Sequence, residues 1–271
     1  MKKLVLISVA LFGLTISSSS AQALRKVSNT AFKRGEYTLY RVYYDAVLTG
    51  KVNAGEAELS IKDENKLIGN RPTFHVVGLG LTKGAFNLFY KVVDRYETYI
   101  DEDAIVPWLF IRRVNEGGYK INQDVTFNQN KDIAISQDYK KNKQTTTKVT
   151  NDIQDIISAI YYARTLDYSS MKVGASANIN FFLDDSIYIS KVQYLGKQQL
   201  TIGAGTFNCL KFKPMVATGN VFKDPYPMTL WVTDDKNHLP VFAESEIIVG
   251  KVKMELVKYS GLANPLTSKV K

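Results

Sequence analysis

The stretch Gly55-Glu56-Ala57-Glu58-Leu59-Ser60-Ile61 alternates small or apolar residues with polar ones. Side chains on a β-strand point alternately to its two faces, so this alternation predicts a strand with one buried and one solvated face. The same period of two runs through Tyr119–Phe127. The sequence therefore predicts that β-strands dominate the fold.

Turn-forming residues separate these runs, as in Gly117-Gly118 and Asp234-Asp235-Lys236-Asn237. The intervening segments have the length of ordinary strands, and the short turns between them favour antiparallel pairing of neighbours. We therefore expect an all-β, mainly antiparallel fold in which a strongly curved sheet forms a barrel or half-barrel. Strands are expected near 36–48, 51–62, 72–81, 92–100, 108–116, 119–128, 131–139, 143–150, 178–183, 186–195, 197–203, 206–216, 228–233, 239–248 and 251–259.

One segment has helical periodicity instead. Apolar residues at positions 153, 156, 157, 160 and 161 form one stripe of a helix expected over 152–166. Asn151 with Gln154 resembles a capping box at its start. The helix could mark a boundary between two domains near 150–168. Because no Pro/Gly/Ser-rich linker flanks it, we expect one β-rich domain, residues 24–271, with the helix covering one end of the sheet. A shorter helical turn is expected at 84–90.

The first 23 residues have the pattern of a secretory signal peptide. Lys2 and Lys3 precede the apolar run Leu4–Ile16, and small or polar residues follow it. This run is too short to span a membrane as a helix. Cleavage is expected after Ala21 or Ala23. The sequence thus predicts an exported protein, soluble in the periplasm or associated with the outer membrane, that does not span a membrane once mature.

Residues that commonly carry catalysis or metal binding are scarce. Cys209 is the sole cysteine, which excludes an internal disulfide and leaves no cysteine near the cleavage site to carry a lipid. His75 is expected on a strand and His238 in a turn, and their spacing fits no zinc site. We predict no metal, no cofactor and no catalytic residue. The formal charge of +9 is spread along the strands, and export argues against nucleic acid as a partner.

Acidic residues leave one enzymatic alternative open. A hydrolase acting on glycan needs two carboxyl groups that converge in space, and such a pair requires no local motif. Glu97, Glu116, Asp184 and Glu244 could each lie at the mouth of a curved sheet. Acids on strands usually belong to the solvated face, so an enzyme is the less favoured interpretation.

Aromatic residues are the remaining candidates for a site. Tyr40 and Tyr44 lie on one face of the first expected strand, and that strand is apolar on both faces. Trp108 and Trp231 could stack on a sugar or line an apolar pocket. We expect a non-enzymatic binding or accessory role, with a lipid-like, amphiphilic or glycan ligand in the concavity of the sheet. The alternative is a structural subunit that binds another envelope protein.

A series of short motifs runs along the mature chain in the order Gly35–Tyr44, Ala54–Ala57, Asp155–Arg164, Gly205–Lys211, Leu230–Asp235, Leu239–Val241 and Gly250–Val252. In this order they resemble a domain-of-unknown-function family of exported, all-β envelope proteins of Gram-negative bacteria. The resemblance implies an all-β envelope domain with one helix. It implies no established activity, so no functional residue is carried over.

Overall fold

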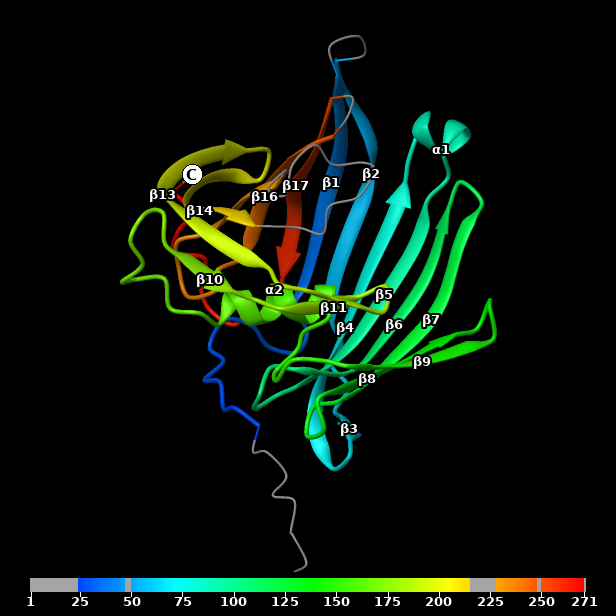
Figure 1. Cartoon of the computed structure of the whole chain (residues 1–271). Coiled ribbons are helices and arrows are strands. Elements are labelled where there is room, and N and C mark those ends of the chain that lie inside the picture. The colour runs from blue at the N-terminus through cyan, green and yellow to red at the C-terminus, as the bar shows by residue number, and fades with distance from the viewer. Residues whose placement is uncertain (1–23, 47–49, 215–227, 248–249, 271) are drawn as a thin grey trace, which may run out of the picture.

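Most strands of the protein join in one long, curved antiparallel sheet (Figure 1). The computed structural model describes residues 24–46, 50–214, 228–247 and 250–270. The expected signal peptide and its cleavage sites lie outside these ranges. The elements are β1 (Tyr37–Ala46), β2 (Gly50–Ile61), β3 (Lys66–Ile68), β4 (Arg71–Thr82), α1 (Phe86–Phe89), β5 (Val93–Asp101), β6 (Pro107–Glu116), β7 (Tyr119–Asn128), β8 (Ile133–Asp138), β9 (Lys143–Lys148), α2 (Ile156–Arg164), β10 (Ser176–Asn178), β11 (Phe181–Leu183), β12 (Ser186–Tyr188), β13 (Lys191–Ile202), β14 (Gly205–Pro214), β15 (Met228–Thr233), β16 (Pro240–Glu246) and β17 (Lys251–Ser260).

The order of the sheet is β10-β13-β14-β15-β16-β17-β1-β2-β4-β5-β6-β7-β8-β9, with β3 paired to the start of β4. β11 and β12 form a separate hairpin. The end strands β9 and β10 do not pair with each other, so the sheet is open. The expectation of an all-β, mainly antiparallel and strongly curved sheet is confirmed. Of the two expected forms, barrel and half-barrel, the structure has the open one.

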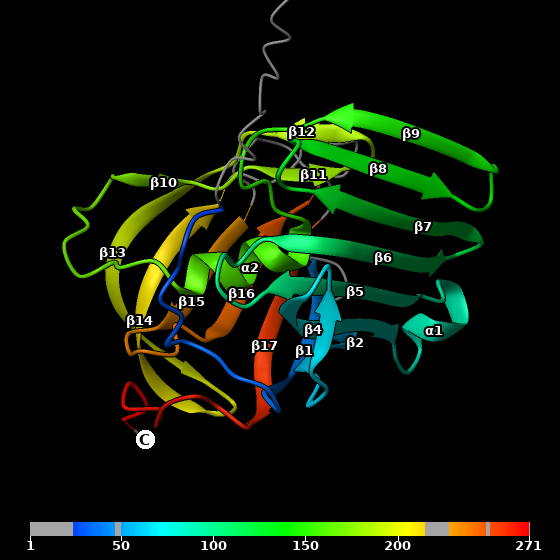
Figure 2. The same ribbon diagram turned by 90° about the horizontal axis from the view of Figure 1, so that it is seen from below.

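The first and last strands meet in the middle of the sheet. β1 pairs with β17 from Tyr37 opposite Ser260 to Asp45 opposite Lys251, and its other edge pairs with β2. The register shifts after Leu39 on one side and after Val42 on the other. Such irregularities bend strands and increase their twist, which contributes to the curvature seen in Figure 2.

Three details differ from the sequence-based expectation. The segment expected as one strand at 186–195 is divided between β12 and the start of β13. β13 continues through the segment expected as a separate strand at 197–203, with a register shift beside Gly196. Gly196 has a φ of +106°, a conformation that glycine adopts without steric cost. The strand expected at 178–183 is divided between β10 and β11, and the short β3 was not expected.

Helix α2 lies on the concave side of the sheet (Figure 2). It starts later than expected, because Asp152 has a φ of +55° and forms a turn. The expected cap at Asn151 and Gln154 is wrong. Asp155 accepts hydrogen bonds from the backbone amides of Ile157 (2.7 Å) and Ser158 (2.8 Å), and the Ser158 hydroxyl accepts one from the Asp155 amide (2.8 Å). This is a complete capping box one turn further along the chain.

Three hydrophobic clusters lie beneath the curved sheet, and the smallest joins Tyr168 to residues of β13–β15 such as Phe212 and Val232. The largest core joins Ile153, Ile157 and Tyr161 of the helical segment to residues of β4–β8, such as Val76 and Phe110. The second core lies among β1 and β14–β17, and its buried members are Tyr40, Phe207, Cys209, Trp231, Leu239, Val241 and Leu256. Helix α2 packs into the first core and leaves a hollow between itself and the other two clusters.

Candidate functional site

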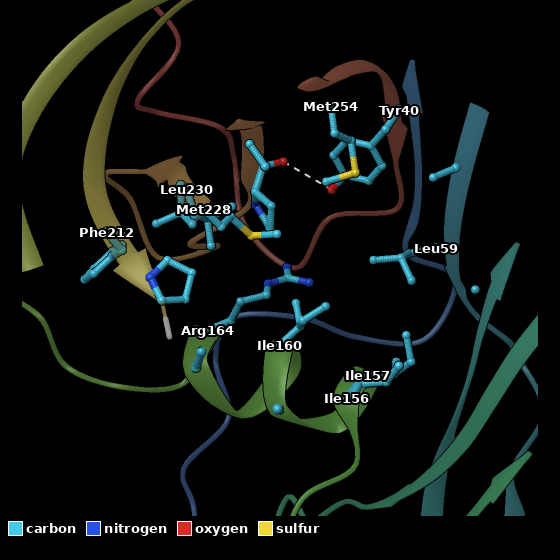
Figure 3. Close-up of a pocket in the computed structure, with 18 of the residues that line it drawn as sticks. Tyr40, Leu59, Ile156, Ile157, Ile160, Arg164, Phe212, Met228, Leu230 and Met254 are labelled. Atoms are coloured by element: carbon cyan, nitrogen blue, oxygen red, sulfur yellow. Dashed lines mark hydrogen bonds between the residues drawn. The ribbon is translucent and has the colours of Figure 1, made fainter. Parts of the chain in front are cut away.

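A cavity of about 650 Å³ lies between α2 and the concave face of the sheet (Figure 3). The helix contributes Ile156, Ala159 and Ile160 to its wall. The expected helical stripe therefore has two roles, since Ile157 and Tyr161 also belong to the core. The sheet side is mainly apolar and includes Tyr40, Val42, Ala57, Leu59, Leu79, Val192, Phe212, Met228, Leu230, Val232, Ala243, Val252 and Met254.

The apolar wall follows from the alternation of the strands. Ala57 and Leu59 are two residues apart on β2, and both line the cavity. The glycines at 78 and 80 line it on β4. A Cβ at Gly78 would lie 3.2 Å from Leu59 Cδ2, so the absence of a side chain there lets the neighbouring strand and helix approach.

Arg164 is the one arginine among the described residues of the wall, and its charge is neutralised within the protein. Arg164 Nη1 and Nη2 donate to the two carboxylate oxygens of Glu36 at 2.5 and 2.8 Å. Its Nε donates to the Asn237 carbonyl oxygen at 3.0 Å. Burial alone would lower the pKa of Arg164, but the Glu36 carboxylate outweighs it and the pKa is raised. Arg164 is therefore already used in holding α2 and is not available to a ligand.

Other polar groups in the wall are also engaged. The Tyr40 hydroxyl donates to the Pro240 carbonyl oxygen at 3.1 Å, and burial raises the pKa of Tyr40 to about 12 (Figure 3). The Tyr168 hydroxyl donates to the Ala163 carbonyl oxygen at 2.7 Å. These hydroxyls are therefore tied to the protein's own backbone.

Further polar side chains in the wall include Glu58, Asp94, Ser245 and His238. The buried hydroxyl of Ser245 has no hydrogen-bond partner among the described residues. Nδ1 of His238 lies 2.8 Å from the Arg164 carbonyl oxygen. A carbonyl can only accept, so Nδ1 carries the hydrogen and Nε2 of the neutral ring is an acceptor. A ligand would thus find few polar contacts along a mainly apolar wall.

The four aromatic candidates are not brought together. Tyr40 lines the cavity, whereas the other three are not among its lining residues. Tyr44 packs edge-on against Phe86, with ring centroids 5.9 Å apart. Trp108 donates from Nε1 to Asp101 at 2.9 Å, and Trp231 donates to Gln198 at 3.0 Å. The sequence analysis did not identify Met228, Met254 or His238 as residues of the cavity wall, because no local pattern shows which face of a strand will meet the helix.

Three of the four candidate carboxylates form ion pairs, and Arg112 interacts with both Asp184 and Glu116. Glu97 binds Arg95 and His75, at 2.7 Å each. Asp184 forms an ion pair with Arg112 at 2.6 Å, and Glu244 forms ion pairs with lysines of β17. Glu116 hydrogen-bonds to Asp94, and burial together with that neighbour raises the pKa of Glu116.

Other sites of chemistry are not found in the described ranges. Within them, no cluster of three or more His, Cys, Asp or Glu side chains could hold a metal ion. Cys209 is buried, and burial raises the pKa of its thiol to about 12. The same ranges contain no helix of the length and hydropathy required to cross a membrane.

Comparison with known proteins gives a family and a related fold. The family model described as "Protein of unknown function (DUF3108)" matches residues 39–257. No curated protein matches the sequence. The crystal structure of a β-barrel-like protein of the domain of unknown function DUF1849 from Brucella abortus has 11% identity and a TM-score of 0.56, over 88% of this chain and 99% of that one.

Two further solved structures resemble the chain less closely. A candidate lipoprotein from Parabacteroides distasonis has 11% identity and a TM-score of 0.30, over 88% of this chain and 100% of that one. A candidate exported protein with a YmcC-like fold from Bacteroides fragilis has 9% identity and a TM-score of 0.28, with the same coverage. At these identities the likeness to the Brucella protein shows a shared fold and nothing about activity.

Proposed function

This chain belongs to the DUF3108 family of proteins of unknown function, and we propose that it binds the apolar part of an amphiphilic ligand, such as a lipid, on the concave face of its sheet. The observation that carries the proposal is the mainly apolar cavity of about 650 Å³ between α2 and the sheet. Its size falls within the range of roughly 300–1,000 Å³ typical of small-molecule sites.

The exposure of Ile160 supports the binding of an apolar ligand in the cavity. This side chain projects from α2 into the cavity and is 37% exposed, although it lies inside the curve of the sheet. Removing apolar surface from water is favourable, by about 0.8 kcal/mol for each buried methylene of a lipid chain. Met228 and Met254 also line the cavity, and flexible thioether side chains adapt to ligands of varied shape. An apolar chain would therefore gain contacts that the protein leaves unmade.

The charges of the wall favour the tail of the ligand over its head group. Arg164, its one arginine, is neutralised by Glu36, and no lysine of the described residues lines it. A carboxylate or phosphate buried there would lack a partner, which is costly. The polar head group would therefore remain outside, toward solvent. The same scarcity of polar atoms makes a glycan a poorer ligand.

The proposal includes the cellular setting and the non-enzymatic role. The amino-terminal pattern supports export to the periplasm, and the position of the sole cysteine, Cys209, supports a protein without a lipid anchor. The continuous main sheet supports one mature domain over residues 24–271. Glu97, Asp184 and Glu244 are engaged in ion pairs with arginine or lysine, which favours binding over carboxylate-based hydrolysis of glycan. A non-enzymatic carrier or accessory protein of the envelope fits these features, and it needs neither a metal nor nucleic acid.

Titration with N-phenyl-1-naphthylamine, a neutral apolar fluorophore, tests the proposal. We expect saturable one-to-one binding to the wild type. Ala57→Phe fills the cavity from β2 and should weaken binding at least about tenfold, a loss of roughly 1.4 kcal/mol. Ser60→Phe is the matched control, because Ser60 lies on the opposite face of the same strand. Its binding should equal that of the wild type.

Mass spectrometry of organic extracts adds a second measurement. Protein purified without detergent should carry an amphiphile that is depleted in the Ala57→Phe protein and retained in the Ser60→Phe protein. Equal fluorophore binding by all three proteins, together with extracts that contain no amphiphile, would show that the cavity is not a binding site. Circular dichroism should confirm that both variants retain the wild-type fold.

A further inference from the structure

Helix α1 and the residues after it place apolar side chains in full contact with solvent. Leu88 is 83% exposed and Phe89 is 87% exposed. Tyr90 and Tyr119 beside them are also exposed. We call Phe86–Lys91 with Tyr119 the apolar tip. Large exposed apolar groups are common singly, but a cluster of them usually marks an interaction surface.

The base of the tip is held firmly by the sheet. Tyr90 packs on Gly117, where an added Cβ would lie 2.3 Å from its ring. The amide of Gly117 donates to the Lys91 carbonyl oxygen at 2.9 Å, and Tyr119 pairs with Glu116 across the turn. The ring of Phe86 packs on Tyr44. Leu88 and Phe89 thus project from an ordered support.

The cavity extends to the same rim of the sheet as the tip. α1 connects the end of β4 to the start of β5, at the upper edge of the sheet in Figure 1. Among the residues that line the cavity, Asp94 is second in β5, Ser245 is next to last in β16, and Val252 is second in β17. Because the strands are antiparallel neighbours, these positions lie at the edge that carries α1. Helix α2 lies at the other end of the cavity.

Two lysines lie at the tip. Lys91 is its last residue and Lys120 follows Tyr119, and no ion pair joins either of them to a described carboxylate. Lys83 is paired with Glu56 at 3.4 Å. The nearby Glu116 is hydrogen-bonded to Asp94. Exposed Leu and Phe with flanking Tyr and Lys is the combination that suits the boundary between lipid head groups and acyl chains.

We propose that the apolar tip docks on an anionic lipid surface, with Leu88 and Phe89 inserted among the acyl chains and Lys91 and Lys120 at the head groups. The inference rests on the proposed binding of an amphiphile, because it places the rim of the cavity against the membrane that supplies or receives this ligand. A tail could then pass between bilayer and cavity while its head group stays at the interface.

Co-sedimentation with vesicles tests this docking. Wild-type protein should bind vesicles of phosphatidylcholine and phosphatidylglycerol and should bind pure phosphatidylcholine more weakly. Leu88→Ser with Phe89→Ser should reduce binding to the mixed vesicles at least about tenfold. Lys91→Glu with Lys120→Glu should remove the preference for the anionic lipid. The control Leu67→Ser alters an exposed leucine on β3 and should have no effect.

The outcomes separate this inference from the proposed function. Fluorophore binding should be unchanged in the tip variants, because none of their residues lines the cavity. Weak wild-type binding to mixed vesicles, equal to that of the Leu88/Phe89 variant, overturns membrane docking even if the cavity binds its ligand. Concentration-dependent self-association that the tip variant abolishes, without an effect on vesicles, would assign the tip to a protein interface and also overturn the proposal.

Discussion

Asp155 is a carboxyl group buried completely at the start of α2. Burial raises its pKa from 3.8 to about 6, although hydrogen bonds from Thr98 (2.5 Å) and from the Ile157 and Ser158 amides partly offset the shift. The same side chain thus caps a helix and resists ionisation. The cap is needed because the first amides of a helix have no partner within it.

This shift predicts how stability depends on pH. Between about pH 4 and 6 the folded state holds a proton on Asp155 that the unfolded state has released. The contribution of Asp155 to the free energy of unfolding should therefore fall by up to about 3 kcal/mol as pH rises through this window, and stay constant above it. Urea unfolding of the wild type and of Asp155→Asn, which keeps the capping oxygen, measures the difference. A difference that does not vary with pH would contradict the assigned pKa.

Helix α2 is fixed at its other end by the buried pair Arg164 and Glu36. Arg164 also donates to the carbonyl oxygens of Ala31 and Asn237, so it ties the helix to the segment before β1 and to the turn between β15 and β16. This anchoring keeps Ile156 and Ile160 at the cavity. The position of the cavity wall therefore depends on a residue that does not itself bind a ligand.

Removing one member of this pair should be costly. Arg164→Met leaves the Glu36 carboxylate buried without its cation, and we expect a loss of about 3–5 kcal/mol in the free energy of unfolding. Adding Glu36→Gln removes that charge and should recover about 1 kcal/mol or more. Chemical unfolding of the two single variants and the double variant gives the coupling. Strictly additive losses would show that the two side chains act independently.

The strands and the helix were more predictable from sequence than the helix cap and the strand bulges were. The period of two predicted the strands, and the stripe at positions 153–161 predicted α2, because both patterns report burial of one face. The cap was misplaced, since the Gln154 amide donates to the Ile105 carbonyl oxygen, a contact far away in sequence. The bulge at Gly196 likewise depends on pairing with β14.

The candidate site was less predictable for the same reason. Tyr40 was proposed from the apolar faces of its strand and does line the cavity. Trp108 and Trp231 were proposed from their size, yet their indole nitrogens are bound to Asp101 and Gln198 within the protein. Which side chains share a cavity depends on strand order and curvature, and neither is written in a local pattern.

At the scale of the molecule, the open sheet leaves two unpaired edges. β9 carries lysines at both ends, Lys143 and Lys148, and β10 is only three residues long. Charged or very short edge strands hinder edge-to-edge association. The sheet can therefore stay open beside the cavity without offering a long apolar edge to a second copy.

The meeting of β1 and β17 at the centre of the sheet has a consequence for the route of folding. Read from β10 to β17 and then from β1 to β9, the strands stand in the sheet in chain order, apart from the side hairpins. The only central pairing between sequence-distant strands is thus the one that joins the two ends of the described chain, and closing so long a loop is entropically expensive.

A circular permutant would remove that expense. Opening the chain between the exposed Ser169 and Ser170, and joining Val270 to Leu24 with a flexible linker, makes every main-sheet pairing local. Lower contact order accompanies faster folding, so stopped-flow refolding should be at least roughly tenfold faster than in the wild type, with the same final circular dichroism. An unchanged rate would mean that the β1–β17 pairing forms after the slowest step. In the natural order of the chain, by contrast, the central pairing of the sheet cannot form until β17, the last strand, is available to pair with β1.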